Sequence, residues 1–353
     1  MTRRRIAFTI AAAMAAALTW AAAEAAAQEP MEEAPPDEVP SVETSPDDVL
    51  SGDAPPAEVA SDEAPPDEAL SGDMVGELRQ IVTAYEDNLL DLARANSLGY
   101  IEMIAANQGV DPWVPGEDTP IVLPTGHILP DAERQGIVVN LAEHRLYYFG
   151  PEDGDPVTFP LGVGKEGWST PLGTTKIVRR KERPTWFPPE SIRAEKPHLP
   201  KAVPPGPHNP LGSHALYFDW PTYLIHGTNM PWGVGRRVSH GCIRLYPEDI
   251  ARLFELVPVG TPVQVIEQAI KVGWSDGALY LEAHPEAGQA DELERTGKIW
   301  SLGADSLADV LYRIKARAGA AQDRLDWRLI RKTLKERSGV PVQITLDRSQ
   351  IPG

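Results

Sequence analysis

The spacing of hydrophobic and polar positions changes character several times along the 353 residues. Between residues 136 and 266, short apolar runs alternate with turns rich in Gly, Pro and polar residues, a pattern that predicts β-strands. The expected strands are 137–140, 146–149, 157–163, 174–179, 215–219, 223–226 and 263–266. A polar turn at 142–145 joins the first two as a hairpin, so the sheet is expected to be mostly antiparallel.

Apolar residues three or four positions apart, which indicate helices, occur in shorter stretches. Residues 91–94 and 101–107 predict two short helices that Gly99 separates, before a short strand at 121–124. A longer helix begins at Pro247, since Pro is favoured at the first helical position. Its inward side chains are expected to be Ile250, Leu253, Phe254 and Val257.

The C-terminal part carries both patterns. Residues 272–274 and 279–281 predict a hairpin, and 306–316 and 327–337 predict amphipathic helices. The chain as a whole is therefore expected to be mainly β with α-helices. We expect a small βα module at 74–130, an antiparallel β-sandwich-like domain at 136–266 and an α/β C-terminal extension at 267–353.

The N-terminus has the three parts of a secretory signal peptide. Arg3, Arg4 and Arg5 precede an apolar run at 6–23, and small residues at 25–27 follow. We therefore expect residues 1–27 to be a signal peptide that is cleaved after Ala27. A retained membrane anchor stays open as an alternative, because the apolar run approaches the ~17–20 residues that span a bilayer.

Residues 28–73 have the composition of a disordered tether. They contain 15 Asp and Glu, nine Pro and no Lys or Arg. Low hydrophobicity with unopposed charge cannot offset the entropy lost on folding. The formal charge of the chain is −18, but 30 basic and 35 acidic residues remain once residues 1–73 are set aside. The acidic balance argues against a nucleic-acid binder, which needs a basic surface.

The candidate chemistry lies between His226 and Arg244. The sequence reads His226-Gly-Thr-Asn, then Ser239-His-Gly-Cys-Ile-Arg244, and Cys242 is the only cysteine. A nucleophilic cysteine needs a neighbouring base and donors for an oxyanion, and Gly241 allows a tight turn of the backbone there. An inert buried cysteine and a zinc site formed by His226, His240 and Cys242 are the alternatives. Upstream, residues 184–210 contain nine prolines and predict a long irregular loop.

This motif resembles the signature of the L,D-transpeptidases with a YkuD-like catalytic domain. In that signature Ser-His-Gly-Cys is followed by an apolar residue, and a His-Gly lies about 16 positions upstream. The resemblance covers about residues 136–266 and includes 171–173, 184–186 and 209–212. Many members carry Asn two residues after the cysteine, whereas this chain has Arg244. The Arg form fits the Gram-negative branch that begins with a LysM-like module, which residues 88–93, 106–109 and 121–124 resemble.

The resemblance implies a mechanism without a cofactor or a metal. Cys242 would attack the bond between residues three and four of a peptidoglycan tetrapeptide stem and expel D-alanine. His226 would be the base, oriented by the carbonyl of Gly227, with His240 as the other candidate base. Amides around Gly241 and Cys242 would hold the oxyanion.

The resemblance also implies where the substrate binds and which partners the enzyme has. Arg244, Ser239, Trp232 and Trp186 are the candidate substrate-binding residues. The expected partners are peptidoglycan stem peptides and glycan in the periplasm. The acceptor would be a second stem (a 3→3 crosslink), a lysine of an outer-membrane protein or lipoprotein, or water. A catalytically idle wall-binding module and an ordinary cysteine protease remain the alternative functions.

Overall fold

The computed structural model describes residues 72–151, 154–300 and 304–346. The expected signal peptide and all but the last two residues of the expected tether lie outside them. Residues 189–199, which contain the short helix α4 (Glu190–Glu195), form a compact unit of their own and are not placed relative to the rest. No described helix combines the length and the hydropathy needed to cross a membrane.

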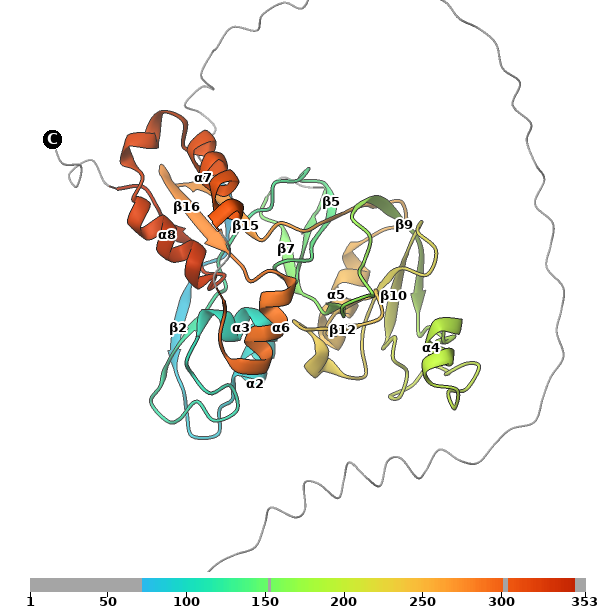
Figure 1. The fold of residues 1–353 in the computed structure, drawn as a ribbon. Coiled ribbons are helices and arrows are strands. Elements are labelled where there is room, and N and C mark those ends of the chain that lie inside the picture. The colour runs from blue at the N-terminus through green and yellow to red at the C-terminus, as the bar shows by residue number, and fades with distance from the viewer. Residues whose placement is uncertain (1–71, 152–153, 301–303, 347–353) are drawn as a thin grey trace, which may run out of the picture. The chain divides into compact units, whose positions relative to one another are not determined.

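One eight-stranded sheet dominates the middle of the chain (Figure 1). Its order is β13-β11-β10-β9-β14-β5-β6-β7, and all its neighbours pair antiparallel except β11–β13 and β14–β5. The strands are β5 (Gly136–Asn140), β6 (Arg145–Phe149), β7 (Val157–Pro160), β9 (Gly173–Glu182), β10 (His214–Phe218), β11 (Leu224–His226), β13 (Ile243–Arg244) and β14 (Pro262–Ile266). The mostly antiparallel strands predicted from the sequence are confirmed.

The expectation of a sandwich is corrected to a single mixed sheet. The ten-residue strand β9 pairs through Gly173 to Lys176 with β14 and through its later residues with β10. The strands that a sandwich would divide between two sheets are thereby joined in one. The predicted strand 157–163 is also shorter, since β7 ends at Pro160 and Val163–Gly164 form a separate strand, β8, which pairs with β12 (Arg237–Ser239).

Helix α5 (Pro247–Leu256) covers one face of this sheet and confirms the predicted helix. Ile250, Leu253 and Val257 are fully buried in the main core, and Phe254 packs against its margin. Burial of such side chains contributes about 1.5–3 kcal/mol each, so this face anchors the sheet. The opposite face at β5 and β6 is also buried, through Val138, Tyr147 and Phe149.

Residues 79–123 form a strand–helix–helix–strand arrangement. It consists of β2 (Arg79–Val82), α2 (Leu89–Ala95), α3 (Tyr100–Ala106) and β3 (Pro120–Leu123), and β2 pairs antiparallel with β3. The two predicted helices and the strand are confirmed. Asn88 caps α2 by accepting a hydrogen bond from the Asp91 N–H at 2.9 Å.

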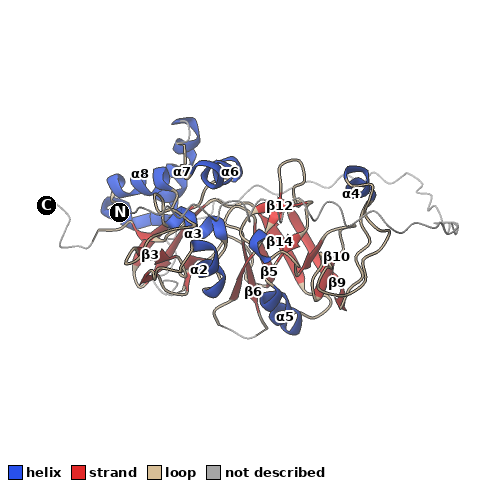
Figure 2. Cartoon of the chain, turned by 90° about the horizontal axis from the view of Figure 1, so that it is seen from below, coloured by secondary structure: helices blue, strands red, loops and turns tan. Residues whose placement is uncertain are grey.

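Helix α6 (Ala287–Thr296) packs beside α3 although about 180 residues separate them (Figures 1 and 2). Its Ala290 and Leu293 are buried in the same core as Leu89, Ile101 and Ile104. The sequence pattern does not predict this helix, because few of its residues are apolar. The core of the N-terminal module is thus completed by a segment from the C-terminal extension.

The rest of the extension has a core of its own. The hairpin of β15 (Ile270–Ser275) and β16 (Ala278–Ala283) is joined by β17 (Val342–Gln343), and helices α7 (Ala304–Ala318) and α8 (Trp327–Glu336) pack on it. The predicted hairpin and both helices are confirmed. Next to the hairpin lie β1 (Met74–Val75) and β4 (His127–Ile128), which pair with each other.

Candidate active site

Parallel pairing of β11 with β13 brings the two ends of the His226–Arg244 motif together. Ile225 lies opposite Ile243 and His226 opposite Arg244, and the Leu245 N–H donates to the His226 carbonyl at 2.9 Å. Cys242 immediately precedes β13, so it lies beside the Leu224 end of β11. The fifteen residues between His226 and Cys242 therefore leave β11 and return beside it as β13.

A tight turn at 239–242 presents Cys242. The Ser239 hydroxyl donates to the Cys242 carbonyl at 2.6 Å, and the Thr170 hydroxyl donates to the Gly241 carbonyl at 2.8 Å. Gly241 has a φ of 93°, a conformation that favours glycine, and a Cβ there would lie 3.2 Å from the Tyr223 ring. With both carbonyls engaged, the N–H groups of Gly241 and Cys242 donate to no backbone carbonyl of the described residues.

The thiol of Cys242 is half-buried and protonated at rest. Its Sγ donates to the Thr222 carbonyl at 3.7 Å. Burial raises the pKa of Cys242 to about 11, while the Arg244 charge and a backbone hydrogen bond at Leu224 act in the opposite direction. The thiol consequently needs a base at the moment of attack rather than a standing positive partner.

His226 is a neutral imidazole with a lone pair on Nε2. It is buried at the end of β11, and its Nδ1–H donates to the Gly227 carbonyl at 2.5 Å, as the family resemblance implies. Because a carbonyl only accepts, Nδ1 carries the proton and Nε2 carries the lone pair. Burial, followed by the Arg244 charge, lowers the pKa of His226 to about 3, so the imidazole is neutral.

His240 lies in a different environment. It is half-buried, and its ring meets Trp168 edge to face with centroids 4.9 Å apart. Trp168 belongs to the loop after β8, whose Lys165 N–H donates to the Ser239 carbonyl at 2.9 Å. This contact packs the His240 ring against Trp168.

The backbone of Arg244 is held by a pair of hydrogen bonds to Gly162. Its N–H donates to the Gly162 carbonyl at 3.0 Å, and the Gly162 N–H donates back at 2.8 Å. Nε is buried and has no hydrogen-bond partner within the part of the chain that the structure describes. Desolvation lowers the pKa of Arg244, and its charge acts on both Cys242 and His226.

The remaining substrate-binding candidates lie in three different settings. Trp186 packs with Cys242 against the small cluster of Leu211, Ala215 and Leu224. Trp232 lies on the 3₁₀ turn Pro231–Gly233, is half exposed and is not part of that cluster. Ser239 is fully buried, and the turn uses its hydroxyl.

The proline-rich loop at 184–210 is more ordered than an irregular loop. Trp186 and Val203 exchange backbone hydrogen bonds of 2.9 and 2.8 Å. The fully buried Asn209 donates to the carbonyls of Pro184 at 2.9 Å and Pro204 at 3.1 Å. These bonds close the loop on itself and hold Trp186 at the Cys242 cluster.

No sequence pattern marks Thr222, Thr170 or Trp168 as part of the site. Thr222 acts through its carbonyl oxygen, Thr170 through a bond to a main-chain atom and Trp168 through ring packing. None of these contacts requires a residue type in a recognisable spacing. Of the three, Thr222 has an unusual backbone conformation for a non-glycine residue, with a φ of 72°.

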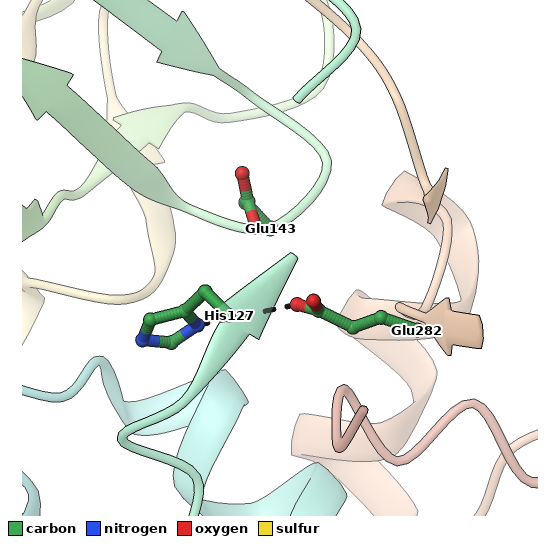
Figure 3. A group of neighbouring side chains, drawn as sticks. All are labelled: His127, Glu143 and Glu282. Carbon is green, nitrogen blue, oxygen red and sulfur yellow. Dashed lines mark ion pairs between the residues drawn. The ribbon is translucent and has the colours of Figure 1, made fainter. Parts of the chain in front are cut away.

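A buried group with metal-ligand chemistry lies elsewhere, at His127, Glu143 and Glu282 (Figure 3). Among the described residues it is the one set of three or more His, Cys, Asp or Glu whose ligand atoms come close enough together to hold an ion. The structure therefore does not gather His226, His240 and Cys242 into the zinc site considered as an alternative.

The negative charge of this buried group is offset in part from within the chain. The Lys271 ammonium lies 2.9 Å from Glu282 and also contacts Glu143. Burial lowers the pKa of His127 well below its usual value, so its contact with Glu282 at 4.0 Å is with a neutral ring. The lysine offsets one carboxylate charge, and Nε2 of His284 also lies close to both carboxylates, 2.6 Å from Glu282 and 3.5 Å from Glu143.

Comparison with known proteins gives a consistent match. Residues 134–265 match the family model of the YkuD, L,D-transpeptidase catalytic domain. The chain is 38% identical over 281 residues to the probable L,D-transpeptidase YbiS of Escherichia coli K12, covering 77% of this chain and 88% of that protein. It is 41% identical over 254 residues to the probable L,D-transpeptidase ErfK/SrfK of the same organism, covering 70% and 79%.

A solved structure also matches. The catalytic domain of the L,D-transpeptidase from Enterococcus faecium is 26% identical, with a TM-score of 0.31, and the match covers 39% of this chain and all of that domain.

Proposed function

The chain belongs to the L,D-transpeptidases, a family of cysteine transpeptidases that act on peptidoglycan, and we propose that Cys242 is its nucleophile and His226 its base. The observation that carries this assignment is the hydrogen bond from Nδ1 of His226 to the Gly227 carbonyl. It leaves Nε2 as a lone-pair nitrogen on the strand that pairs beside the nucleophile. His240 then supports the turn through Trp168.

In the first half-reaction the thiol of Cys242 is acylated by the donor stem. As Sγ bonds to the carbonyl carbon of residue three of a tetrapeptide stem, its proton passes to Nε2 of His226. The C–N bond to residue four then breaks, and the departing D-alanine amine takes the proton from His226. A thioester remains on Cys242. This step starts from a neutral thiol and a neutral imidazole, because the pKa of Cys242 is raised and the pKa of His226 is lowered.

The N–H groups of Gly241 and Cys242 are the proposed oxyanion donors. They belong to the turn that Ser239 and Thr170 hold through its carbonyls. Preorganised donors of this kind stabilise a transition state by about 3–4 kcal/mol each. Arg244 adds a fixed positive charge beside the developing negative charge, and Trp186 forms one wall of the peptide site.

In the second half-reaction an amine attacks the thioester and gives its proton to His226. The thiolate of Cys242 leaves and is reprotonated. The proposed acceptors are the side-chain amine of a second stem, which gives a 3→3 crosslink, and the lysine of an outer-membrane protein or lipoprotein. Water as acceptor would make the enzyme an L,D-carboxypeptidase. We propose that the enzyme acts in the periplasm and that residues 1–27 are removed as its signal peptide.

Purified Cys242→Ala and His226→Asn variants test the assignment. Tetrapeptide muropeptides are the substrate, and released D-alanine and crosslinked product are measured. We expect loss of both products from each variant and retention of most activity in His240→Asn. Wild-type product no higher than the background of Cys242→Ala would indicate a wall-binding module without catalysis, and equal product above background would exclude Cys242 as the nucleophile. Cleavage of all-L peptides without D-alanine release would indicate a cysteine protease.

A covalent test uses the same thiol. A carbapenem is expected to add one adduct mass to the wild-type protein and none to Cys242→Ala, because the chain has a single cysteine. Muropeptide and lipoprotein-linkage analysis of a deletion strain then identifies the acceptor.

A second role is proposed for the N-terminal module, namely glycan binding. Its two long loops expose Tyr85 and Trp113, which are 81% and 57% accessible, and Val114 beside them. The loops are tied together, since the Leu89 N–H donates to the Pro112 carbonyl at 2.8 Å. Exposed aromatic rings on an ordered platform suit the apolar faces of sugars.

Sedimentation with insoluble peptidoglycan tests this second role. Trp113→Ala is expected to reduce the bound fraction, whereas replacement of Tyr312, an aromatic on α7 that is 72% exposed, by Ala is not. Equal binding by all three proteins would contradict it.

A further inference from the structure

The segment that leads into the nucleophile turn is held by elements outside the catalytic sheet. Gly235 lies against the first turn of α3, where the Ile101 N–H donates to the Gly235 carbonyl at 3.0 Å. The backbones are so close that a Cβ on Gly235 would lie 2.3 Å from the Cα of Gly99. The N-terminal module thus contacts the chain seven residues before Cys242.

Helix α6 of the C-terminal extension forms ion pairs with the next two residues, Arg236 and Arg237. Nη2 of Arg236 lies 2.6 Å from Glu294, and Nε of Arg237 lies 3.1 Å from Asp291. Asp291 and Glu294 are one helical turn apart and therefore share a face of α6. Arg236 also stacks over the Tyr100 ring of α3, 4.4 Å from its centroid.

These ion pairs are better placed than ordinary surface pairs. The Arg236 and Arg237 side chains are only 14% and 16% exposed. Exposed pairs contribute little because solvent screens them, and burial of one member reduces that screening. Helix α6 is itself fixed, since its Ala290 and Leu293 are buried in the core of the N-terminal module.

A short path connects these pairs to the thiol. Arg237 begins β12, whose pairing with β8 spans Arg237 to Ser239 and includes a shift of register between them. Ser239 ends the strand, and its hydroxyl holds the Cys242 carbonyl at 2.6 Å. A two-stranded ladder this short and irregular is weak by itself, so the position of the turn depends on what holds β12.

We propose that Asp291 and Glu294 are positioning residues for the transpeptidase reaction: through Arg237 and Arg236 they hold β12 and thereby place the thiol of Cys242. This inference rests on Cys242 being the nucleophile. It gives helix α6 a role in the reaction, which explains why part of the extension returns to the start of the chain.

The isosteric variants Asp291→Asn and Glu294→Gln, singly and together, test the proposal. Both remove charge without removing volume. Glu292→Gln is the matched control, because Glu292 lies on the same helix and pairs with Arg295. The rate of Cys242 acylation by a carbapenem, kcat and KM for D-alanine release, and the thermal midpoint are measured for each protein.

We expect the double variant to acylate and turn over about tenfold more slowly, since small misplacements of reacting groups have effects of this size or larger. KM and the thermal midpoint should stay close to those of Glu292→Gln. Charge reversal in Arg237→Asp should slow acylation similarly, and Arg237→Asp with Asp291→Arg should restore at least half of the rate.

An acylation rate of the double variant within twofold of wild type would overturn the proposal. So would a loss of rate that accompanies a fall in the thermal midpoint and is not restored when Arg237→Asp is combined with Asp291→Arg. Failure of the proposed function would look different. In that case wild type itself would neither release D-alanine nor form the adduct.

Discussion

The thiol of Cys242 donates to the carbonyl oxygen of Thr222, and Thr222 holds a left-handed backbone conformation with a φ of 72°. A β-branched residue is unfavourable there, because its Cβ substituents crowd the backbone. The turn between β10 and β11 therefore holds a strained residue whose carbonyl faces the proposed nucleophile. Strain of this kind persists where surrounding contacts enforce it.

Replacing Thr222 by Asn should stabilise the protein by about 1 kcal/mol, since Asn tolerates the left-handed region and keeps the carbonyl. Chemical denaturation measures the change. Thr174→Asn, in the extended strand β9, is the matched control and should have the opposite sign, because Asn is disfavoured in strands. A loss of stability in Thr222→Asn would show that the Thr side chain compensates for the strain.

Alkylation of the single cysteine should report a high pKa. Between pH 7 and 10 the rate with iodoacetamide should rise about tenfold per pH unit, because thiolate is the reactive form and the pKa of Cys242 is about 11. A plateau near neutral pH would indicate a standing thiolate–imidazolium pair. Arg244→Gln should move the profile to higher pH, since the Arg244 charge lowers the pKa of the thiol, whereas Arg179→Gln should leave it unchanged.

His226 should make the protein sensitive to acid. Its pKa is about 3 in the folded state and near 6.5 when unfolded, so below pH 6.5 the unfolded state binds a proton that the folded state does not. Stability from this group is present above pH 6.5 and is lost as the pH falls towards 3. The slope is up to about 1.4 kcal/mol per pH unit for one proton.

Denaturant unfolding of wild type and His226→Gln between pH 7 and 4 measures this contribution. The variant should lose the part of the slope that His226 supplies, and the two stability curves should converge in acid. Parallel curves over the whole range would contradict the assignment of a neutral, buried imidazole.

Removing Lys271 should be costly. Its ammonium is fully buried, donates to the Ile128 carbonyl at 2.6 Å and balances Glu143 and Glu282. Lys271→Met leaves two buried carboxylates without their cation, so we expect a loss of about 3–5 kcal/mol in the free energy of unfolding. Lys176→Met, which breaks the exposed pair with Asp219, should cost at most about 1 kcal/mol. Similar losses in both variants would contradict this account.

Two glycines with the same φ separate strain from crowding. Gly235 and Gly277 both have a φ of 75°, but a Cβ on Gly277 meets nothing within 4 Å, whereas one on Gly235 collides with Gly99 and Tyr100. Gly277→Ala should cost about 1 kcal/mol from backbone strain alone. Gly235→Ala should cost several times more and reduce the yield of folded protein. Equal losses in denaturant unfolding would mean that the two segments separate easily.

Most of the helices and strands predicted from the sequence are found in the structure because short local patterns determine them. The hairpin of β5 and β6, the strand ending at His226 and the helix beginning at Pro247 each follow from apolar spacing and turn residues within a few positions. The single sheet does not, because it depends on β9 pairing with β14 at one end and β10 at the other. Helix α6 is missed for a similar reason, since Ala290 and Leu293 find their contacts far away in the sequence.

The site divides in the same way. Cys242 and His226 are proposed from the sequence because their chemistry needs particular side chains, and Gly241 because the turn needs a residue without one. The hydrogen bond of His226 to Gly227 is found as the family resemblance implies. Thr222 contributes a carbonyl oxygen that any residue supplies, and Asp291 and Glu294 act on the turn through two arginines. Side-chain chemistry within one motif can be read from the sequence, whereas support from distant backbone and charge cannot.

The packing of α6 into the core of α2 and α3 constrains the order of folding. Leu89 and Ile101 obtain their complete set of neighbours only when Ala290 and Leu293 arrive, after nearly 200 further residues have been synthesised. Contacts of such long sequence separation form slowly. Part of the apolar surface of α2 and α3 therefore stays exposed until α6 packs against it. The catalytic sheet can form before the core of the N-terminal module is complete.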